Sequence, residues 1–453
     1  MASIKPRLQK DGTTSYLITV SCGRDSSGKQ ILKYITFIPK SKAPTKAEKE
    51  LNAFVSDFEQ RAKAGDLPEG DKVTFEAFAK IWEKNWLPAK TQGVQERYKD
   101  ILRIRVFPEI GFMKLTSIRA THIDKIIADE LAPKDKGGKG LAPKTVRDTF
   151  TVINSVLRYA LKKQYIRENP CLRCDDLPSV EMRTGEDLQF FNEDQARRFM
   201  NDALTMDYQY SFPERHRKNK KTGEKITVKA YTVTRKIDLM WRVYFTMAIY
   251  TTMREGEMCG LTWNDIDFEK QTIKIYKSLA RSKEIGQYIK DPKTKAGIRE
   301  IYIPSALVAL LKSWKQEQTA LCVKLGTAWK GHRNGLKDDG KTPDCFDDNT
   351  VFIQNKAIGQ PLNLSSPGHK FHEIIDLYNA TCENEADKLP HIRLHDLRHT
   401  GATLLLGNNT DIETVSKRLG HAKASVTLDI YGHALPENDK VAAETLEAML
   451  KGS

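Results

Sequence analysis

The hydrophobic pattern of this sequence changes along its length, and that change limits the fold more than any other feature. Near the amino end, the run YLITV at 16–20 is rich in residues that favour strands. Between 143 and 164, apolar residues recur every three or four positions, as on one face of a helix. A single small domain is therefore excluded, and 453 residues are enough for two to four domains.

Residues 1–66 are expected to form a small sheet packed on one helix. Turn signals at 11–12 (DG) and 25–28 (DSSG) separate three stretches rich in β-formers. The expected strands are Ile4–Gln9, Thr14–Cys22 and Ile31–Phe37. From Thr45 the pattern becomes helical and stops at Gly65. The apolar face of that helix is made of Leu51, Phe54, Val55 and Phe58.

A short polar linker, DLPEGD at 66–71, precedes a domain expected to be all-helical over residues 73–180. Thr74 is placed to cap its first helix. The apolar face of this helix carries Phe75, Phe78, Ile81 and Trp82. Three more helices are expected around Gln95–Phe107, Arg119–Glu130 and Pro143–Gln164. The apolar face of the last one comprises Val146, Phe150, Ile153, Val156, Leu157, Ala160 and Leu161.

Residues 181–436 are expected to form a third, mainly helical α+β domain with a small antiparallel sheet, so the whole chain is multidomain α+β. Asn192 and Gln195 resemble a capping box, and Thr272–Tyr276 and Glu300–Ile303 are strand-like. Two stretches, 215–225 and 329–349, are expected to be insertions. The first is basic, which fits contact with DNA. The tail, 437–453, has an amphipathic pattern, which by itself fits a helix folded back on its own domain.

Basic residues exceed acidic ones, with 73 Lys and Arg against 59 Asp and Glu and a formal net charge of +14. In residues 1–46 the only acids are Asp11 and Asp25. Gathered cations indicate a double-stranded DNA partner, because phosphate contacts need Lys and Arg on one surface. The alternative is an ordinary solvated face. The candidate DNA-binding residues are Lys5, Arg7, Arg24, Lys33, Lys144 and Arg147.

Other features exclude several classes of protein. The chain has no apolar run of about 18 residues and begins with charged residues, so neither a membrane span nor a signal peptide is expected. We expect a cytosolic protein with seven reduced cysteines. The loop 134–140 lacks the spacing of a phosphate-binding loop, and Cys171 and Cys174 lack further ligands at zinc spacing. No metal or cofactor is expected.

Residues able to do chemistry gather in short boxes of the third domain. His395 and Arg398 in LHDLRHT are three apart, so on a helix both would lie on one face and grip one anion together. Arg254 in MREGE is expected at a turn opening a helix that runs through Met258 and Leu261. The remaining boxes are LGH at 419–421 and DIYGH at 429–433.

A lysine completes this set, at an expected hairpin tip between two strands. The segment DPKTKAG at 291–297 offers Lys293 or Lys295, and the register of the turn leaves both open. The candidate catalytic residues are Arg254, Lys293, His395, Arg398, His421 and Tyr431.

These residue types suit phosphoryl transfer without a metal. The charge on a phosphodiester under attack spreads over its non-bridging oxygens, which guanidinium groups such as those of Arg254 and Arg398 bind in pairs. The Tyr431 oxygen can act as a nucleophile, because phenolate is also a good leaving group in the reverse step. A lysine can protonate the departing sugar oxygen.

Other interpretations of the same residues remain open. In one, Arg254 pairs with Glu255 or Glu257, and His395 and Tyr431 are packing residues. A zinc hydrolase would use His395 and His399, but it lacks the glutamate of the usual zinc motif. A non-catalytic DNA-binding regulator explains the charge but not the ordered boxes. An enzyme like the type IB topoisomerases would share the chemistry.

The boxes MREGE, HDLRH and LGH, followed by Tyr431, resemble the signature of tyrosine recombinases, the phage-integrase family, and especially integrases of prophages and conjugative transposons. The resemblance covers the whole chain. It implies that residues 1–66 bind arm sites, that 73–180 bind core sites, and that Tyr431 forms a 3′-phosphotyrosyl link and releases a 5′-hydroxyl. It also implies phosphate-binding or proton-transfer roles for Arg254, Arg398, His395 and His421, with Lys293 as the favoured general acid.

The resemblance carries expectations about partners as well. Strand exchange would take place in a homotetramer on core and arm attachment sites, with half of the subunits active at a time. The tail would pack on the neighbouring subunit. An accessory excision or DNA-bending factor is a further possible partner, and the protein would work on the bacterial nucleoid.

Overall fold

The computed structural model describes residues 2–9, 13–24, 28, 30–41, 43–63, 71–180, 189–218, 223–292, 294–326, 329, 335–336, 343–344, 349–353, 362–432, 447 and 450. The chain divides into two compact units, Met1–Val180 and Glu181–Ser453. Helices mix with small antiparallel sheets, as expected for the fold class. Among the described residues, no helix is both long and apolar enough to span a membrane.

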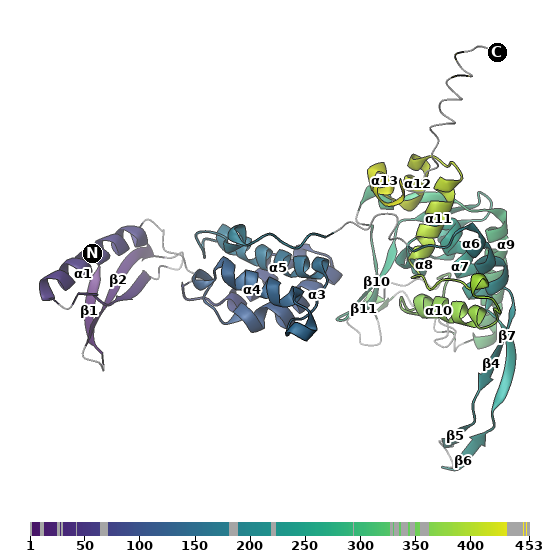
Figure 1. The fold of residues 1–453 in the computed structure, drawn as a ribbon, viewed down its shortest axis with the longest axis horizontal. Helices are drawn as coiled ribbons and strands as arrows, with labels where there is room; N and C mark the ends of the chain where they lie inside the picture. The colour runs from purple at the N-terminus through teal and green to yellow at the C-terminus, as the bar shows by residue number, and fades with distance from the viewer. Residues whose placement is uncertain are drawn as a thin grey trace. The chain divides into compact units, whose positions relative to one another are not determined.

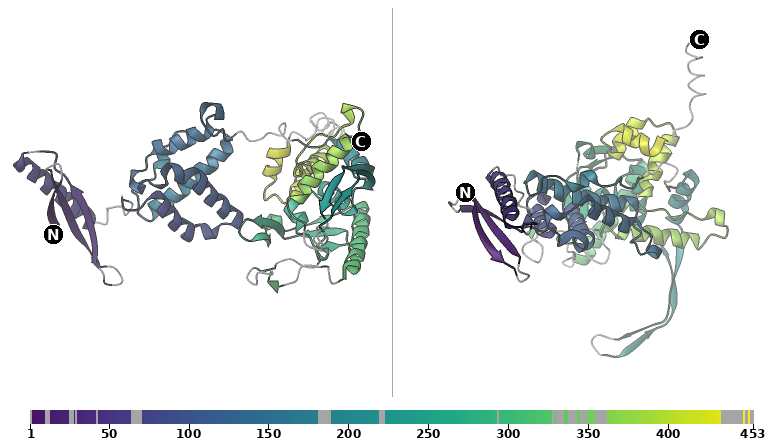
Figure 2. Two further views of the ribbon diagram at one scale, coloured as in Figure 1. Left: turned by 90° about the horizontal axis from the view of Figure 1, so that it is seen from below. Right: turned by 60° about the vertical axis from the view of Figure 1, so that its left-hand side comes forward.

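The first unit begins with a three-stranded antiparallel sheet. Its strands are β1 (Ser3–Leu8), β2 (Thr14–Arg24) and β3 (Gln30–Phe37), in the order β1-β2-β3. Helix α1 (Pro44–Lys63) lies along the sheet (Figures 1 and 2). The small core between them contains Ile18, Val20, Leu51, Phe58 and Ala62. The expected strands and helix are therefore present, while the expected stop at Gly65 lies outside the described residues.

The rest of the first unit is helical. Its helices are α2 (Phe75–Asn85), α3 (Gln92–Ile101), α4 (Ala120–Leu131) and α5 (Pro143–Lys162). Helix α3 continues as a π-helical segment over Leu102–Gly111. The Thr74 hydroxyl accepts the Ala77 N–H at 3.3 Å, so the expected cap is confirmed.

Two residues placed on apolar faces by the sequence pattern are exposed. The buried face of α2 is Phe75, Phe78, Ala79 and Trp82, whereas Ile81 is 37% exposed. Ile81 lies six positions after Phe75, which turns it away from that face. At the end of α5, Leu161 is 36% exposed. Both assignments were wrong because an apolar residue does not need to lie on the buried stripe.

The second unit packs its helices around α7 (Leu239–Thr251), which is buried on nearly all sides. Figure 1 shows α7 in the interior of this unit, with α10 and α11 among the helices around it. The other helices are α6 (Glu193–Arg198), α8 (Glu255–Cys259), α9 (Ser305–Leu325), α10 (Ser366–Asn379), α11 (Asp396–Gly407), α12 (Ile412–Leu419) and α13 (Ala424–Tyr431). The capping box of Asn192 and Gln195 at α6 is confirmed. Helix α8 ends before Leu261, so it is shorter than expected.

The strands of the second unit form small antiparallel sheets. A long ribbon extends away from the helices in Figures 1 and 2; it contains β4 (Asp207–Phe212), β5 (Arg215–Lys218), β6 (Lys225–Val228) and β7 (Tyr231–Lys236). The other strands are β8 (Ile266–Asp267), β9 (Thr272–Ile275), β10 (Ser278–Ser282), β11 (Gly286–Lys290), β12 (Arg299–Tyr302), β13 (Gly335–Leu336) and β14 (Pro343–Asp344).

The pairing of these strands corrects one expectation. Strand β11 pairs with β10, whereas β12 pairs with β9, so the segment 291–298 joins two different sheets and is not the tip of a hairpin. The sequence shows where strands lie but not which strands pair, because pairing depends on contacts far apart in the chain. The second insertion and the tail lie mostly outside the described residues.

Candidate active site

Arg398 joins three segments of the second unit. It lies in the first turn of α11 and is only 4% exposed. Its guanidinium donates to the carbonyl oxygens of Thr252 and Leu419, both at 2.7 Å. A third contact, at 3.2 Å, joins its Nη2 to His421 Nε2. The HDLRH and LGH boxes therefore meet the end of α7 at one side chain.

A glycine allows this meeting. A Cβ on Gly401 would lie 2.5 Å from the Ile249 carbonyl oxygen and 2.7 Å from Thr252 Cγ2, so α11 can approach α7 only because this side chain is absent. Thr252 itself has a φ of 51°, which is rare for a residue with a branched side chain. This conformation ends α7 and presents the Thr252 carbonyl to Arg398.

Glu257 sits between two arginines. Its Oε1 accepts from Arg254 Nη1 at 2.9 Å, and its Oε2 accepts from Arg299 Nη2 at 2.8 Å. The Glu257 and Arg299 side chains are each 7% exposed, whereas that of Arg254 is 41% exposed. The pairing of Arg254 with Glu257, one of the open interpretations, is therefore present. It leaves much of the Arg254 guanidinium at the surface, where an anion has access.

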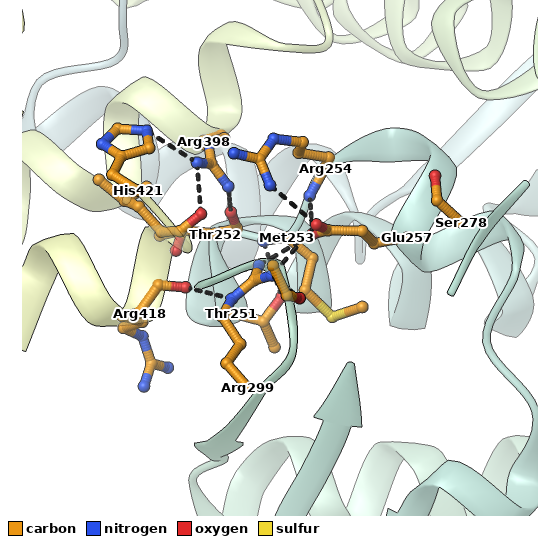
Figure 3. Close-up of polar contacts among 12 residues, drawn as sticks. Thr251, Thr252, Met253, Arg254, Glu257, Ser278, Arg299, Arg398, Arg418 and His421 are labelled. Atoms are coloured by element: carbon orange, nitrogen blue, oxygen red, sulfur yellow. Dashed lines mark hydrogen bonds and ion pairs between the residues drawn. The ribbon is translucent and has the colours of Figure 1, made fainter. Parts of the chain in front are cut away.

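We call Arg254, Glu257, Arg299, Arg398 and His421 the arginine cluster. Figure 3 shows these five side chains gathered around the Thr252 backbone, together with Arg418. Three guanidinium groups face one carboxylate, so the cluster carries excess positive charge. Burial and then the charge of Arg254 lower the pKa of Arg398 to about 9, so Arg398 is still charged at neutral pH.

The histidines of the site are neutral at pH 7. Burial and then Arg398 lower the pKa of His421 to about 4, and the same two causes lower the pKa of His395. A guanidinium can only donate, so His421 Nε2 accepts from Arg398. The other nitrogen, Nδ1, then carries the hydrogen and faces the Thr427 hydroxyl at 2.9 Å.

Tyr431 ends α13 and is 1% exposed. Its hydroxyl lies 2.7 Å from Nδ1 of His399, the residue after Arg398. Burial raises the pKa of Tyr431 to about 12, although the charges of Arg398 and Arg254 act in the opposite direction. The phenol is therefore protonated at neutral pH, and it is close enough to both arginines for their charges to lower its pKa.

Of the two candidate lysines, one is among the described residues. Lys293 lies outside the described residues, and Lys295 begins a short turn over Lys295–Gly297. This turn lies beside the LGH box, because a Cβ on Gly420 would be 3.1 Å from the Ala296 carbonyl oxygen. The turn that begins at Lys295 therefore lies close to the LGH box.

The candidate DNA-binding residues of the first unit are placed differently from one another. Lys5 and Arg7 are exposed on β1, and Lys144 is exposed at the start of α5. Arg147 is half-buried, and its Nε donates to the Pro178 carbonyl at 2.6 Å, so it also holds the chain after α5. Lys33 is half-buried on β3, and Arg24 lies at the end of β2.

Three residues with defined contacts here were not among the candidates. They are His399, Glu257 and Arg299. Of these, Glu257 was considered only as a possible partner of Arg254, and His399 only as a zinc ligand. Arg299 could have been suspected as a charged residue in an otherwise strand-like segment. The sequence carries no signal for the contact between His399 and Tyr431, because it depends on how α11 and α13 pack.

The zinc interpretation gains no support in the described part of the chain. No group of three or more His, Cys, Asp and Glu residues suited to a metal ion occurs there. Asp396 is instead paired with Arg393 at 2.7 Å, and His399 contacts Tyr431. Cys171 and Cys174 are free thiols.

The sequence is similar to a known protein family and to bacterial recombinases and integrases. The model of the "Phage integrase family" matches residues 224–438, which include every candidate catalytic position. A "Tyrosine recombinase XerC-like" from Caldanaerobacter subterraneus subsp. tengcongensis is 24% identical over 98% of both chains. The "ICEBs1 integrase" of Bacillus subtilis is 27% identical over 69% of this chain and 67% of its own.

Solved structures show a similar fold. The Tn1549 transposon integrase in complex with transposon right end DNA matches with a TM-score of 0.59 and 20% sequence identity. The match covers 83% of this chain and 100% of that chain.

Proposed function

Because this chain is a tyrosine recombinase of the phage integrase family, we propose that it integrates and excises a mobile element by cutting DNA with Tyr431. One observation carries the assignment of residues. Arg398 contacts His421 at 3.2 Å, and the Tyr431 hydroxyl lies 2.7 Å from the residue next to Arg398. The boxes spread over the sequence thus meet around one phenol and one cationic cluster.

The chemistry follows from this arrangement. Arg254 and Arg398 bind the non-bridging oxygens of the scissile phosphate and offset the charge that grows there. The Tyr431 oxygen attacks the phosphorus, an O–P bond forms, and the bond to the 5′-oxygen breaks. The products are a 3′-phosphotyrosyl link and a 5′-hydroxyl. Attack by a 5′-hydroxyl of another strand reverses the step and rejoins the DNA.

The departing 5′-oxygen needs a proton, and we assign this role to Lys293. The turn that follows it, at Ala296, lies beside Gly420 of the LGH box, and an ammonium group can protonate an oxygen as it leaves. His395 and His421 are assigned to phosphate binding. Lys295 is the alternative acid. A 5′-bridging phosphorothiolate, whose leaving group needs no proton, should restore cleavage to whichever of Lys293→Ala and Lys295→Ala removes the acid.

The remaining parts of the chain are assigned to DNA binding and assembly. Residues 1–66 bind arm sites, 73–180 bind core sites, and 181–436 carry the chemistry. The exposed Lys5, Arg7 and Lys144 support the first two assignments. The tail 437–453 packs on the neighbouring subunit of a homotetramer formed on DNA. An accessory excision or DNA-bending factor would set the direction, and the element is a conjugative transposon or a prophage.

A trapping experiment tests the proposal. Full-length protein is incubated with a nicked attachment-site duplex taken from the DNA that flanks its gene, so that the short strand diffuses away after cleavage. A protein–DNA adduct that survives denaturant and is lost on protease treatment is expected, while Tyr431→Phe should form none. Tyr208→Phe is the matched control, because Tyr208 is equally buried and its hydroxyl donates to the Ala203 carbonyl at 2.7 Å. Equal adduct from wild-type protein and Tyr431→Phe would contradict the proposal.

A further inference from the structure

The buried hydroxyl of Tyr431 has a specific partner to which the family resemblance assigned no role. The partner is Nδ1 of His399, at 2.7 Å, and the two ring centres are 5.5 Å apart. The rings belong to α13 and α11, so the contact joins the helix of the nucleophile to the helix of Arg398. In the part of the chain that the structure describes, the hydroxyl bonds to His399 and not to His395 or His421.

The surroundings of His399 keep its imidazole neutral. Burial, then His395 and the cations Arg398 and Arg393, lower the pKa of His399 to about 4, although Asp396 acts in the opposite direction. The His395 ring meets the His399 ring edge to face, with centres 5.2 Å apart. A neutral imidazole has one nitrogen that accepts a hydrogen bond and one that donates. The phenol, which is protonated, can therefore donate to Nδ1.

The histidine of the arginine cluster, His421, is already engaged. His421 Nε2 accepts from Arg398 at 3.2 Å, and its Nδ1 faces Thr427 at 2.9 Å. Both of its nitrogens are thus used in holding the arginine cluster. His399 is the histidine whose ring nitrogen already lies at hydrogen-bond distance from the proton that must leave.

We infer that His399 is a further catalytic residue, whose Nδ1 takes the phenolic proton of Tyr431 as the Tyr431 oxygen bonds to phosphorus. The inference rests on the proposed function. The bonds balance: O–H breaks and N–H forms at His399, O–P forms at Tyr431, and the 5′-oxygen leaves with a proton from Lys293. The arriving phosphate also offsets the charges of Arg254 and Arg398, which makes the imidazole more basic when it is needed.

Single-turnover cleavage tests the inference. The substrate is a nicked duplex with a 5′-bridging phosphorothiolate, so that the leaving group needs no proton and only nucleophile activation is measured. Relative to wild-type protein, His399→Ala and His399→Asn should both be slower by about 10²- to 10⁴-fold, with unchanged DNA affinity. Asparagine can still accept a hydrogen bond from the phenol but is not a useful base. His391→Ala is the control, because His391 is an exposed histidine just before the same box, paired with Asp376.

The possible outcomes distinguish a failure of the inference from a failure of the proposed function on which it rests. If His399→Asn cleaves as fast as wild-type protein, His399 only positions the phenol and the inference is wrong. If His399→Ala is as fast as wild-type protein or faster, the contact is dispensable or a resting-state restraint, and the inference is also wrong. Adduct formation by Tyr431→Phe would instead overturn the proposed function itself.

A spectroscopic measurement on wild-type protein tests the same inference without depending on whether a variant folds. Nitrogen-15 NMR of histidine-labelled protein reports which ring nitrogen of His399 carries the hydrogen; the assignment can be made with His399→Asn or from backbone connectivity. The inference expects the hydrogen on Nε2, with Nδ1 accepting from Tyr431. A hydrogen on Nδ1 would mean that this atom donates to the phenol, and it would exclude proton transfer to it.

Discussion

Arg398 and Arg299 in the second unit are buried, whereas Lys5 and Arg7 on β1 of the first unit are exposed. The buried arginines have fixed partners: Arg398 donates to two backbone carbonyls, and Arg299 pairs with Glu257. Charges held in place away from water act strongly on a phosphate without reorganising. Exposed charges are screened by salt and contribute to affinity.

The difference separates two uses of the same residue types. In the arginine cluster, geometry matters, and a change should alter the rate of cleavage or the stability of the second unit. On β1, the number of charges matters, and a change should alter the affinity for DNA and its dependence on salt. The comparison would be wrong if a change in the arginine cluster altered only the affinity for DNA, or if a change on β1 altered the rate of cleavage.

The largest effect is expected from Arg398→Lys. Lysine keeps the charge but replaces a planar fork of donors with a single point, so it cannot hold the phosphate and both carbonyls. We expect adduct formation to slow by about 10³-fold, with DNA affinity nearly unchanged. Trapping on the nicked substrate and a gel-shift titration measure the two quantities. Arg197→Lys, at an exposed pair with Glu193, is the control. If Arg398→Lys lost DNA affinity by as large a factor as it lost cleavage rate, the distinction between the two regions would be wrong.

The second prediction concerns Arg299 and stability. Arg299→Ala leaves a buried Glu257 without its main partner and should lower the free energy of unfolding of the second unit by about 3–5 kcal/mol. Lys388→Ala, which removes the partner of an 87% exposed Glu385, should cost less than about 1 kcal/mol. Urea unfolding compares the two variants. Equal and small losses would show that the buried pair is not a structural clamp.

The third prediction concerns the basic sheet. The double variant Lys5→Ala, Arg7→Ala should weaken binding to arm sites and reduce the slope of log affinity against log salt by about 2, since each lost phosphate contact contributes ~0.9. Cleavage of a core-site substrate should be unchanged, because neither residue belongs to the arginine cluster. Footprinting at two salt concentrations checks the binding. Unchanged footprints at the arm sites would argue against the assignment of residues 1–66.

The last prediction concerns pH. The pKa values of His399 and His421 are lowered to about 4 in the folded protein, below the usual 6.5. The unfolded chain therefore takes up protons first as pH falls, and stability present above pH 6.5 is lost toward pH 4. Urea midpoints at pH 7, 6 and 5 should decline, and His421→Asn should decline less steeply. His391→Ala, at an exposed position, should follow wild-type protein.

Much of this organisation can be predicted from the sequence, for identifiable reasons. The strands of the first unit are bounded by turn residues, and the cap at Thr74 is a local hydrogen bond, so neighbouring residues determine both. The boxes around Arg398 and His421 stand out as chemistry in fixed order. These features need no knowledge of how distant elements pack.

What the sequence did not predict depends on packing. The pairing of β11 with β10, and not with β12, is set by contacts within each sheet. The contact of His399 with Tyr431 spans 32 positions and requires α13 to lie against α11. The buried ion pair of Glu257 is with Arg299, which lies 42 positions further along the chain. Exposure of Ile81 shows that even helical periodicity does not determine every face.

Mapping the covalent bond tests the central claim most directly. Wild-type protein is trapped on the nicked attachment-site duplex, digested with protease and nuclease, and the peptide that keeps a nucleotide is sequenced by mass spectrometry. We expect a 3′-phosphate ester on the Tyr431 hydroxyl, and we expect it at no other residue. A nucleotide attached to any other side chain would contradict the claim that the phenol beside the arginine cluster captures the DNA phosphorus.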